Sequence, residues 1–361
     1  MKKNTHHEDS LFLLKALSVA TFGRGGCSPN PAVGTIIVNA SHEIIATGYH
    51  TGPGKAHAEI EALQKLSHVA KDTTIYVTLE PCAHTGRTPP CTDALIKSGA
   101  KRIVYGYRDP NPIVSGKGAK ALTDAGIICD HIPLPEINNF YESYHHWHKT
   151  KTPFITAKLA MTLDGKIAGE AGARIQITGE ALQEFTHHHR KATDAILTTA
   201  ETIKKDNPKL NARYQNETIL KQLYVLDSQL TLSPESAIFK TTKSITLFHT
   251  REAKPKHQKI FEQLNIRCIP IDKDQGGLNL QQVIQQIGND GIHDLWIEAG
   301  GKCFSAFLES KLVQRALIYI APLWLGKGMA AFSNHFSIAN LNPTSINWQQ
   351  IGSDGVLEMR F

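Results

Sequence analysis

The sequence predicts an α/β protein of two domains, and two observations carry this prediction. The chain has 361 residues, whereas a domain typically takes about 150. Helical and strand-like segments alternate along both halves, a pattern typical of helices packed on a largely parallel sheet. We therefore expect one domain over residues 1–150 and a second over residues 151–361.

The first half is expected to open with a helix and a hairpin. Thr5–Glu8 has the spacing of a capping box, and apolar residues follow with helical spacing as far as Gly23. These residues are Leu11, Leu14, Leu17 and Val19. Strand-like runs over 33–38 and 43–47 flank turn residues and indicate a hairpin.

Beyond the hairpin, the pattern predicts strict alternation. Helices are expected over 57–66, 92–98, 117–124 and 136–150, and strands over 74–79, 102–105 and 127–131. The polar stretch Lys149–Pro153 then reads as a linker. The second half contains seven strand-like runs with helices between most of them, over 154–160, 194–198, 222–226, 244–248, 266–270, 293–297 and 315–320.

Composition and charge predict a cytoplasmic protein, and the positive net charge suits phosphorylated small molecules as ligands. The net charge of +6 is spread along the chain without a block of like charges, so a nucleic-acid-binding arm is not expected. No apolar run approaches the roughly 20 residues of a membrane span, and the N-terminus does not have the pattern of a signal peptide. Six well-separated cysteines favour reduced thiols over a disulfide framework.

The strongest chemical signal is a set of metal ligands. His57-Ala58-Glu59 precedes Pro81-Cys82 and Cys91, and one histidine with two cysteines is a typical ligand set of catalytic zinc. His57 and Cys91 fall at predicted helix starts, where the helix dipole favours a thiolate. Glu59 lies in the same first turn as His57 and is a candidate to carry protons for a zinc-activated water.

Other interpretations of these residues stay open. In the known zinc-deaminase signature two residues separate the cysteines, whereas eight separate Cys82 from Cys91. The group could consist of ordinary reduced cysteines beside a buried histidine, or form a structural zinc site with His84 as fourth ligand. His84 and Arg87 could bind a substrate oxygen or phosphate, or belong to a solvated turn.

At these residues the chain resembles the bifunctional riboflavin-biosynthesis family, which joins a pyrimidine deaminase to a 5-amino-6-(5-phosphoribosylamino)uracil reductase. The long cysteine spacing is itself typical of that family. The matching stretches of the first half are Pro29–Gly34, Gly48–His50, His57–Glu59, Thr78–Cys91 and Asp109–Pro112. Those of the second half are Lys158–Leu159, Leu163–Gly165, Ala195–Leu197, Asp206–Pro208, Asp227–Ser228 and Trp296–Gly301.

The resemblance implies a cytidine-deaminase-like three-layer α/β/α domain and a dihydrofolate-reductase-like α/β domain that uses NADPH. In the first, it implies Zn²⁺ on His57, Cys82 and Cys91, with Glu59 as general acid and base. It implies deaminase substrate contacts at Asn30, His50, His84 and Arg87. In the reductase, it implies catalytic roles for Lys158, Asp206 and Glu298, and substrate contacts at Arg174, Arg190, Leu210, Arg213 and Glu298. The implied cofactor contacts are Ala160, Gln176, Thr202, Asp206, Ser228, Gly300 and Gly301.

Two features of the second half bear on these assignments. Trp296–Glu298 reads as a buried strand entering the Gly300-Gly301 turn and a helix, whose start could cradle a cofactor phosphate or simply form a turn. Many family members carry a tryptophan where this chain has Gln176, so an aromatic surface for the cofactor is missing there. His187–His189 and His145-His146 are predicted to be histidines on helix surfaces.

We therefore predict a bifunctional enzyme of riboflavin biosynthesis. It deaminates 2,5-diamino-6-(5-phosphoribosylamino)pyrimidin-4(3H)-one and then reduces the ribosyl group of the product to ribityl with NADPH. Its partners are phosphorylated pyrimidines, with no nucleic acid and no membrane, and it is expected to form a dimer or tetramer. One alternative is a nucleoside or nucleic-acid base deaminase with an unrelated C-terminal domain; another is a zinc-stabilised binding protein without catalysis.

Overall fold

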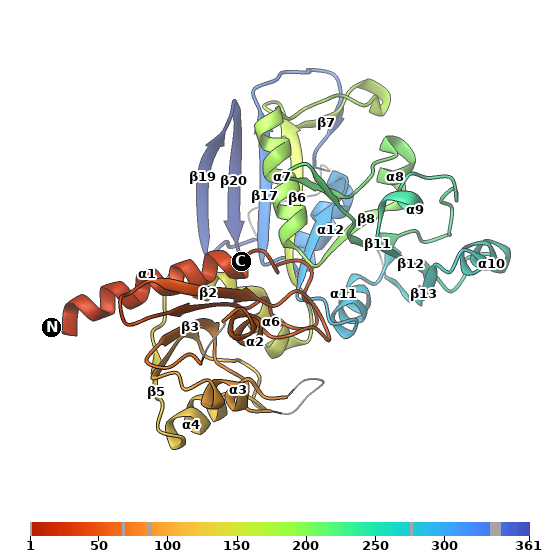
Figure 1. The fold of residues 1–361 in the computed structure, drawn as a ribbon. Helices are drawn as coiled ribbons and strands as arrows, with labels where there is room; N and C mark the ends of the chain where they lie inside the picture. Colours follow the sequence, from red (N-terminus) through yellow and green to blue (C-terminus); the bar gives the residue numbers. More distant parts are fainter. Residues whose placement is uncertain (1, 67–68, 85–88, 275–276, 333–340) are drawn as a thin grey trace. The chain divides into compact units, whose positions relative to one another are not determined.

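A computed structural model of the chain describes residues 2–66, 69–84, 89–274, 277–332 and 341–361. The chain divides into two units, Met1–Lys151 and Thr152–Phe361, each with its own sheet (Figure 1).

In the described part of the first unit, five strands form one sheet in the order β2-β1-β3-β4-β5. They are β1 (Gly34–Val38), β2 (Ile44–Tyr49), β3 (Thr74–Leu79), β4 (Arg102–Tyr107) and β5 (Ile128–His131). β1 is antiparallel to β2 and β3, whereas β3, β4 and β5 are parallel. The predicted hairpin and parallel strands are confirmed. The carboxyl ends of β3, β4 and β5 therefore lie along one edge of the sheet.

Helices cover both faces of this sheet. They are α1 (Lys2–Ala20), α2 (Ala58–Gln64), α3 (Cys91–Lys97), α4 (Lys117–Asp124), α5 (Pro135–Phe140) and α6 (Glu142–Thr150). α1, α5 and α6 supply one apolar cluster with residues such as Leu13 and Ile137. α2, α3 and α4 supply the opposite cluster with residues such as Leu95 and Leu122. The strands alternate between the two clusters, which confirms the predicted three-layer α/β/α arrangement.

Two predictions about these helices were wrong. α1 begins at Lys2, so Thr5 lies inside the helix, because the preceding lysines have good helix propensity and extend it. Its buried face includes Leu13, whereas Leu11 is 48% exposed. The expected helix over 136–150 is two helices interrupted at Tyr141, which has φ −93° and ψ 7°. The Tyr141 ring is buried and its hydroxyl lies 2.6 Å from Thr78 Oγ1, so this break seats the ring in the core.

Within the described residues of the second unit, nine strands form a sheet in the order β13-β12-β11-β8-β16-β6-β17-β20-β19. They are β6 (Phe154–Thr162), β8 (Ala195–Thr199), β11 (Gln222–Leu226), β12 (Ser244–Thr250), β13 (Arg267–Ile271), β16 (Asp294–Glu298), β17 (Arg315–Ala321), β19 (Ser345–Ile351) and β20 (Asp354–Arg360). The seven predicted strands are present and mutually parallel. β20 and β19 add an antiparallel edge that the sequence did not reveal, because β19 is almost wholly exposed and forms no apolar run.

Helices also flank this second sheet on both faces. They are α7 (Glu180–Ala192), α8 (Ala200–Asp206), α9 (Ile238–Thr241), α10 (Pro255–Gln263), α11 (Leu280–Asn289) and α12 (Gly301–Glu309). α11 and α12 pack on one face and α7 to α10 on the other. Short ribbons that were not predicted pair β7 (Lys166–Ala168) with β18 (Met329–Ala330), β9 (Ala212–Tyr214) with β10 (Glu217–Ile219), and β14 (Lys273–Asp274) with β15 (Gly277–Leu278).

Among the described residues, no helix combines the length and apolar character that a membrane crossing requires. All six cysteines lie in the described ranges, and no two of them form a disulfide.

Two candidate active sites

The structure brings the three predicted zinc ligands together at the edge of the first sheet. His57 caps the start of α2, Cys82 follows β3, and Cys91 is the first residue of α3. His57 Nδ1 lies 3.0 Å from Cys91 Sγ and 3.6 Å from Cys82 Sγ. The ligand atoms of the three residues all lie within 4.8 Å of one another. Both helix starts thus point a metal-binding side chain at the same spot.

This donor set fits a zinc ion. Bonds of about 2.3 Å to sulfur and about 2.0 Å to nitrogen in a tetrahedron place the ligand atoms about 3.5–3.8 Å apart. The nitrogen of His57 lies 3.6 Å from Cys82 Sγ and 3.0 Å from Cys91 Sγ, so an ion fits after the second contact widens by about 0.5 Å. The hydrogen bond from Cys91 lowers the pKa of Cys82, while the contact with Cys82 raises the pKa of Cys91. Cys82 is thus the more readily ionised of the two thiols. A bound cation would stabilise both as thiolates.

Glu59 lies where a proton carrier is needed. It sits in the first turn of α2 and is 4% exposed. Burial raises its pKa, and the nearby Cys82 raises it further. Its carboxyl also contacts the thiol of Cys91. A buried carboxyl with a raised pKa beside a metal site can both accept and release a proton.

The structure places only some of the predicted substrate-binding residues beside the metal ligands. Asn30 Nδ2 donates to His50 Nε2 at 3.1 Å, and the His50 ring lies edge-on to that of His57 at 5.4 Å. His50 Nδ1 donates to the carbonyl of Ala56 at 3.0 Å, so both ring nitrogens are fixed. His84 is exposed and does not belong to the ligand cluster, so the structure offers no support for it as a fourth zinc ligand. Arg87 lies outside the described residues.

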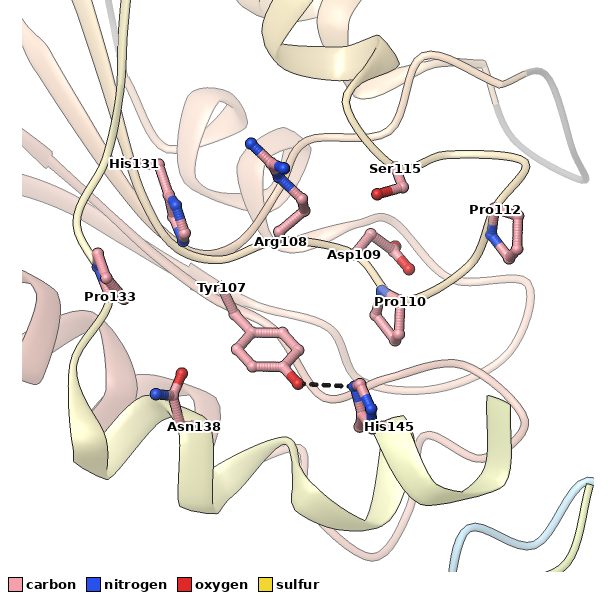
Figure 2. Close-up of a pocket in the computed structure, with 10 residues that line it drawn as sticks. All are labelled: Tyr107, Arg108, Asp109, Pro110, Pro112, Ser115, His131, Pro133, Asn138 and His145. Carbon is pink, nitrogen blue, oxygen red and sulfur yellow. Dashed lines mark hydrogen bonds between the residues drawn. The ribbon is translucent and has the colours of Figure 1, made fainter. Parts of the chain in front are cut away.

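A cavity that sequence reasoning missed lies at the carboxyl ends of β4 and β5 (Figure 2). Its volume is about 520 Å³, and its lining includes Tyr107, Arg108, His131 and His145. The Tyr107 hydroxyl lies 3.0 Å from His145 Nδ1, the contact drawn in Figure 2. Burial raises the pKa of the neighbouring Asp109 to about 6. The available signal was its position, since ligands of parallel sheets often bind beyond the carboxyl ends of the strands.

In the second unit, three predicted residues form an ion-pair cluster. Arg190 on α7 donates from Nε and Nη2 to the two carboxylate oxygens of Glu298, at 2.9 and 2.8 Å. Lys158 Nζ on β6 lies 3.6 Å from Glu298 Oε1. Trp296 Nε1 donates to the same carboxylate at 3.1 Å. Burial raises the pKa of Glu298, but the charges of Arg190 and Lys158 outweigh it and hold the pKa well below its usual range.

Other predicted reductase residues lie on neighbouring segments. Asp206 ends α8, and Arg174 Nη1 donates to its backbone carbonyl at 3.4 Å. Leu210 is buried and has φ +47°. Arg213 lies on β9, where its guanidinium contacts the ring of His187.

Several of the predicted cofactor residues lie beyond the carboxyl ends of neighbouring strands of the second sheet. Thr202 lies in the first turn of α8 just after β8, Ser228 follows β11, and Gly300 follows β16; these three strands are neighbours and parallel. A Cβ on Gly301 would lie 1.7 Å from the carbonyl oxygen of Ala331. At Gly300 it would meet no described atom within 4 Å, so a ligand can approach the backbone there.

Two remaining cofactor positions differ in setting. Ala160 is half-buried on β6. Gln176 is exposed and donates from Nε2 to the carbonyl of Thr178 at 2.8 Å.

The prediction that the histidines of α7 are surface residues was wrong for His187, which is 8% exposed. His189 stacks on Trp296, with ring centroids 5.1 Å apart and an angle of 11° between the planes. His187 thus contacts β9 and His189 contacts β16, and the sequence run His187–His189 does not show which of its rings pack against other elements.

Two family models match the chain. Residues 6–107 match the model of the cytidine and deoxycytidylate deaminase zinc-binding region, and residues 153–357 match the RibD C-terminal domain. The alternative of an unrelated C-terminal domain is therefore not supported.

Whole-chain relatives agree with both matches. The riboflavin biosynthesis protein RibD of Aquifex aeolicus is 35% identical over 89% of this chain and 89% of its own. That of Escherichia coli is 35% identical over 88% of this chain and 89% of its own.

Solved structures also resemble the full chain. Acinetobacter baumannii RibD has a TM-score of 0.86 at 29% identity, covering 98% of this chain and 99% of its own. The Thermotoga maritima diaminohydroxyphosphoribosylaminopyrimidine deaminase/5-amino-6-(5-phosphoribosylamino)uracil reductase has a TM-score of 0.85 at 32% identity, with 99% of each chain covered.

Proposed function

Because the chain belongs to the RibD family, we propose a role for each unit and each site residue in the two reactions of that family. The chain is a bifunctional enzyme of riboflavin biosynthesis, with a zinc-dependent deaminase and an NADPH-dependent reductase. We assign residues 1–150 to the deaminase and residues 151–361 to the reductase. The observation that carries the deaminase assignment is the convergence of His57, Cys82 and Cys91 beside the buried Glu59.

In the deaminase, His57, Cys82 and Cys91 hold zinc, which when bound supplies a water of lowered pKa. Glu59 takes a proton from the attacking water and delivers it to the leaving amino group of the diaminopyrimidine. Its burial and raised pKa support this exchange, because a general acid and base works best when its pKa lies near the working pH. Asn30 and His50 orient the pyrimidine, and His84 and Arg87 contact its substituents.

In the reductase, the ionised Glu298 fixes Arg190 and Lys158 in place. These two cations, with Arg213, suit an anionic phosphoribosyl substrate, while Arg174 and Leu210 border it. Asp206 at the end of α8 lies near both substrate and cofactor. Hydride transfer is the chemistry that NADPH supplies when bound, and the protein contributes position and charge.

The cofactor is held along the carboxyl edge of the second sheet. Gly300 and Gly301 begin α12, and a helix start of this kind favours a phosphate group. Ala160, Gln176, Thr202 and Ser228 complete the contacts, together with Asp206.

The remaining assignments concern the setting of the enzyme. We assign it to the cytoplasm, with phosphorylated pyrimidines as its ligands and no nucleic-acid or membrane partner. We also assign it a dimeric or tetrameric state, which sedimentation of the full chain measures directly.

A coupled assay tests the function. Full-length protein of known zinc content is given the diaminopyrimidine phosphate, and ammonia release and NADPH absorbance are followed together. We expect ammonia release followed by loss of NADPH. Zinc-loaded protein that releases no ammonia would refute the deaminase assignment. Ammonia release without NADPH oxidation would refute the reductase assignment.

A further inference from the structure

The ring of His187 and the side chain of Arg213 form a close pair in the second unit. Arg213 donates to His187 Nε2 from Nε at 3.0 Å and from Nη2 at 2.8 Å. The backbone amide of Arg213 also lies against the ring, 3.2 Å from Nδ1. The histidine is buried in α7, whereas the arginine is an exposed residue of β9. A fixed group thus holds a side chain that would otherwise be free to move.

The charge state of His187 suits this arrangement. Burial, together with the nearby charges of Arg190 and Arg213, lowers the pKa of His187 to about 4. Near neutral pH the imidazole is therefore uncharged, so a ring nitrogen can accept from a guanidinium without repelling it.

The surrounding contacts fix β9 on the same helix face. His187 and Arg190 lie three residues apart and so share one side of α7. Arg190 Nη1 donates to the carbonyl of Asn211 at 3.0 Å, just before β9, while its other nitrogens hold Glu298. The helix therefore positions the start of β9 and the Arg213 head at the same time as it positions the ion-pair cluster.

We propose that His187 is a positioning residue of the reductase, which holds the Arg213 guanidinium ready for the phosphate of the phosphoribosyl substrate. The proposal rests on the proposed function, which assigns Arg213 to substrate binding. An arginine side chain loses rotamer freedom when it binds a ligand, and fixing it beforehand removes that cost from the binding step.

The test measures steady-state kinetics of the full-length reductase with 5-amino-6-(5-phosphoribosylamino)uracil. We expect His187→Ala to raise the KM for this substrate about 3- to 12-fold, because the unheld Arg213 side chain must then be ordered when the phosphate binds. The kcat and the KM for NADPH should change less than about twofold. His187→Gln offers an amide oxygen to the guanidinium and should recover most of the loss. Glu184→Ala, at an exposed position of the same helix, is the control and should behave as wild type.

A double variant separates positioning from a general structural effect. If His187 acts through Arg213, then His187→Ala combined with Arg213→Ala raises the KM no further than Arg213→Ala alone. Additive losses, or a normal KM in His187→Ala when Arg213→Ala raises it, would overturn the positioning role and leave the proposed function intact. A normal KM in Arg213→Ala would instead refute the substrate role of Arg213, and the positioning role with it. Should His187→Ala fail to fold, His187→Leu fills the buried space without offering a hydrogen-bond acceptor, and its double variant with Arg213→Ala supplies the same comparison.

Discussion

The three metal ligands of the deaminase site come from a short stretch of chain, with only 34 positions from His57 to Cys91. In the reductase site, by contrast, the Glu298 carboxylate is paired with Arg190 from 108 positions earlier, and with Lys158 from further still. The first site is organised around metal ligands at two helix starts and one strand end, and the second around a partly buried network of opposite charges. Loss of a single side chain should therefore remove the metal and its reaction in the first unit, and should destabilise the fold in the second.

Removal of a metal ligand should have the largest effect. It should abolish the deaminase reaction and leave the reductase reaction intact. We expect Cys91→Ala to lose zinc and to lower ammonia release by several orders of magnitude, because the metal-activated water is gone. Reduction of the already deaminated substrate should continue. Metal analysis and both assays measure this. Cys129→Ala, a free cysteine of the same unit outside the ligand cluster, is the control, and full zinc content in Cys91→Ala would contradict the ligand assignment.

Removing a charge from the reductase ion-pair cluster should lower the stability of the protein as well as its reductase activity. Glu298→Gln leaves Arg190 and Lys158 with an uncompensated charge in a poorly exposed site, and such a loss typically costs about 3 kcal/mol. Urea unfolding measures the change. Glu201→Gln breaks an exposed pair with Lys205 and should cost under about 0.5 kcal/mol. Equal losses in the two variants would contradict the account of the cluster.

The same cluster predicts a pH dependence. Although burial raises the pKa of Glu298, Arg190 and Lys158 hold it below its unfolded value, which is about 4.3. The stabilisation by the ionised carboxylate is therefore fully present above that pH and is lost as the pH falls toward the folded pKa. The difference in unfolding free energy between wild type and Glu298→Gln should shrink between pH 7 and pH 3. A difference in unfolding free energy that stays constant from pH 7 to pH 3 would contradict the role of the ionised Glu298 in stability.

The contrast between the sites also explains what the sequence could predict. His57, Glu59, Cys82 and Cys91 were predicted because a histidine, a glutamate two residues later and two cysteines form a recognisable zinc-site pattern, even though the cysteines are further apart than in the known signature. Lys158, Arg190 and Glu298 were assigned only through the resemblance, since charged residues at unrelated positions have no spacing of their own.

The sequence also could not show which histidines of α7 are buried, because that depends on contacts with distant segments. Three successive histidines cover a wide arc of the helix, and only the packing of Trp296 and β9 decides which of them is buried. The antiparallel edge of β19 and β20 was missed because β19 is exposed and therefore polar in pattern.

The neighbouring Gly300 and Gly301 should respond differently to substitution, because only one of them is packed against another segment. Gly301→Ala places a methyl group against the Ala331 carbonyl and should destabilise the protein by about 1–3 kcal/mol. Gly300→Ala meets no described atom and should leave stability unchanged while raising the KM for NADPH. Thermal unfolding and NADPH titration distinguish the two. An unchanged KM in Gly300→Ala would remove Gly300 from the cofactor site.

The smallest expected effect concerns Gln176. Gln176→Trp supplies the aromatic surface that this chain lacks, and aromatic stacking should tighten NADPH binding by about two- to tenfold. Direct titration of NADPH measures it, and no gain would show that Gln176 does not face the cofactor.

The most direct test of the central claim, one chain with two independent sites, is Glu59→Gln in the full-length protein. We expect one zinc per chain, ammonia release lowered at least about a hundredfold because the proton carrier is lost, and unchanged NADPH oxidation with the deaminated substrate. Normal ammonia release by this variant would contradict the account.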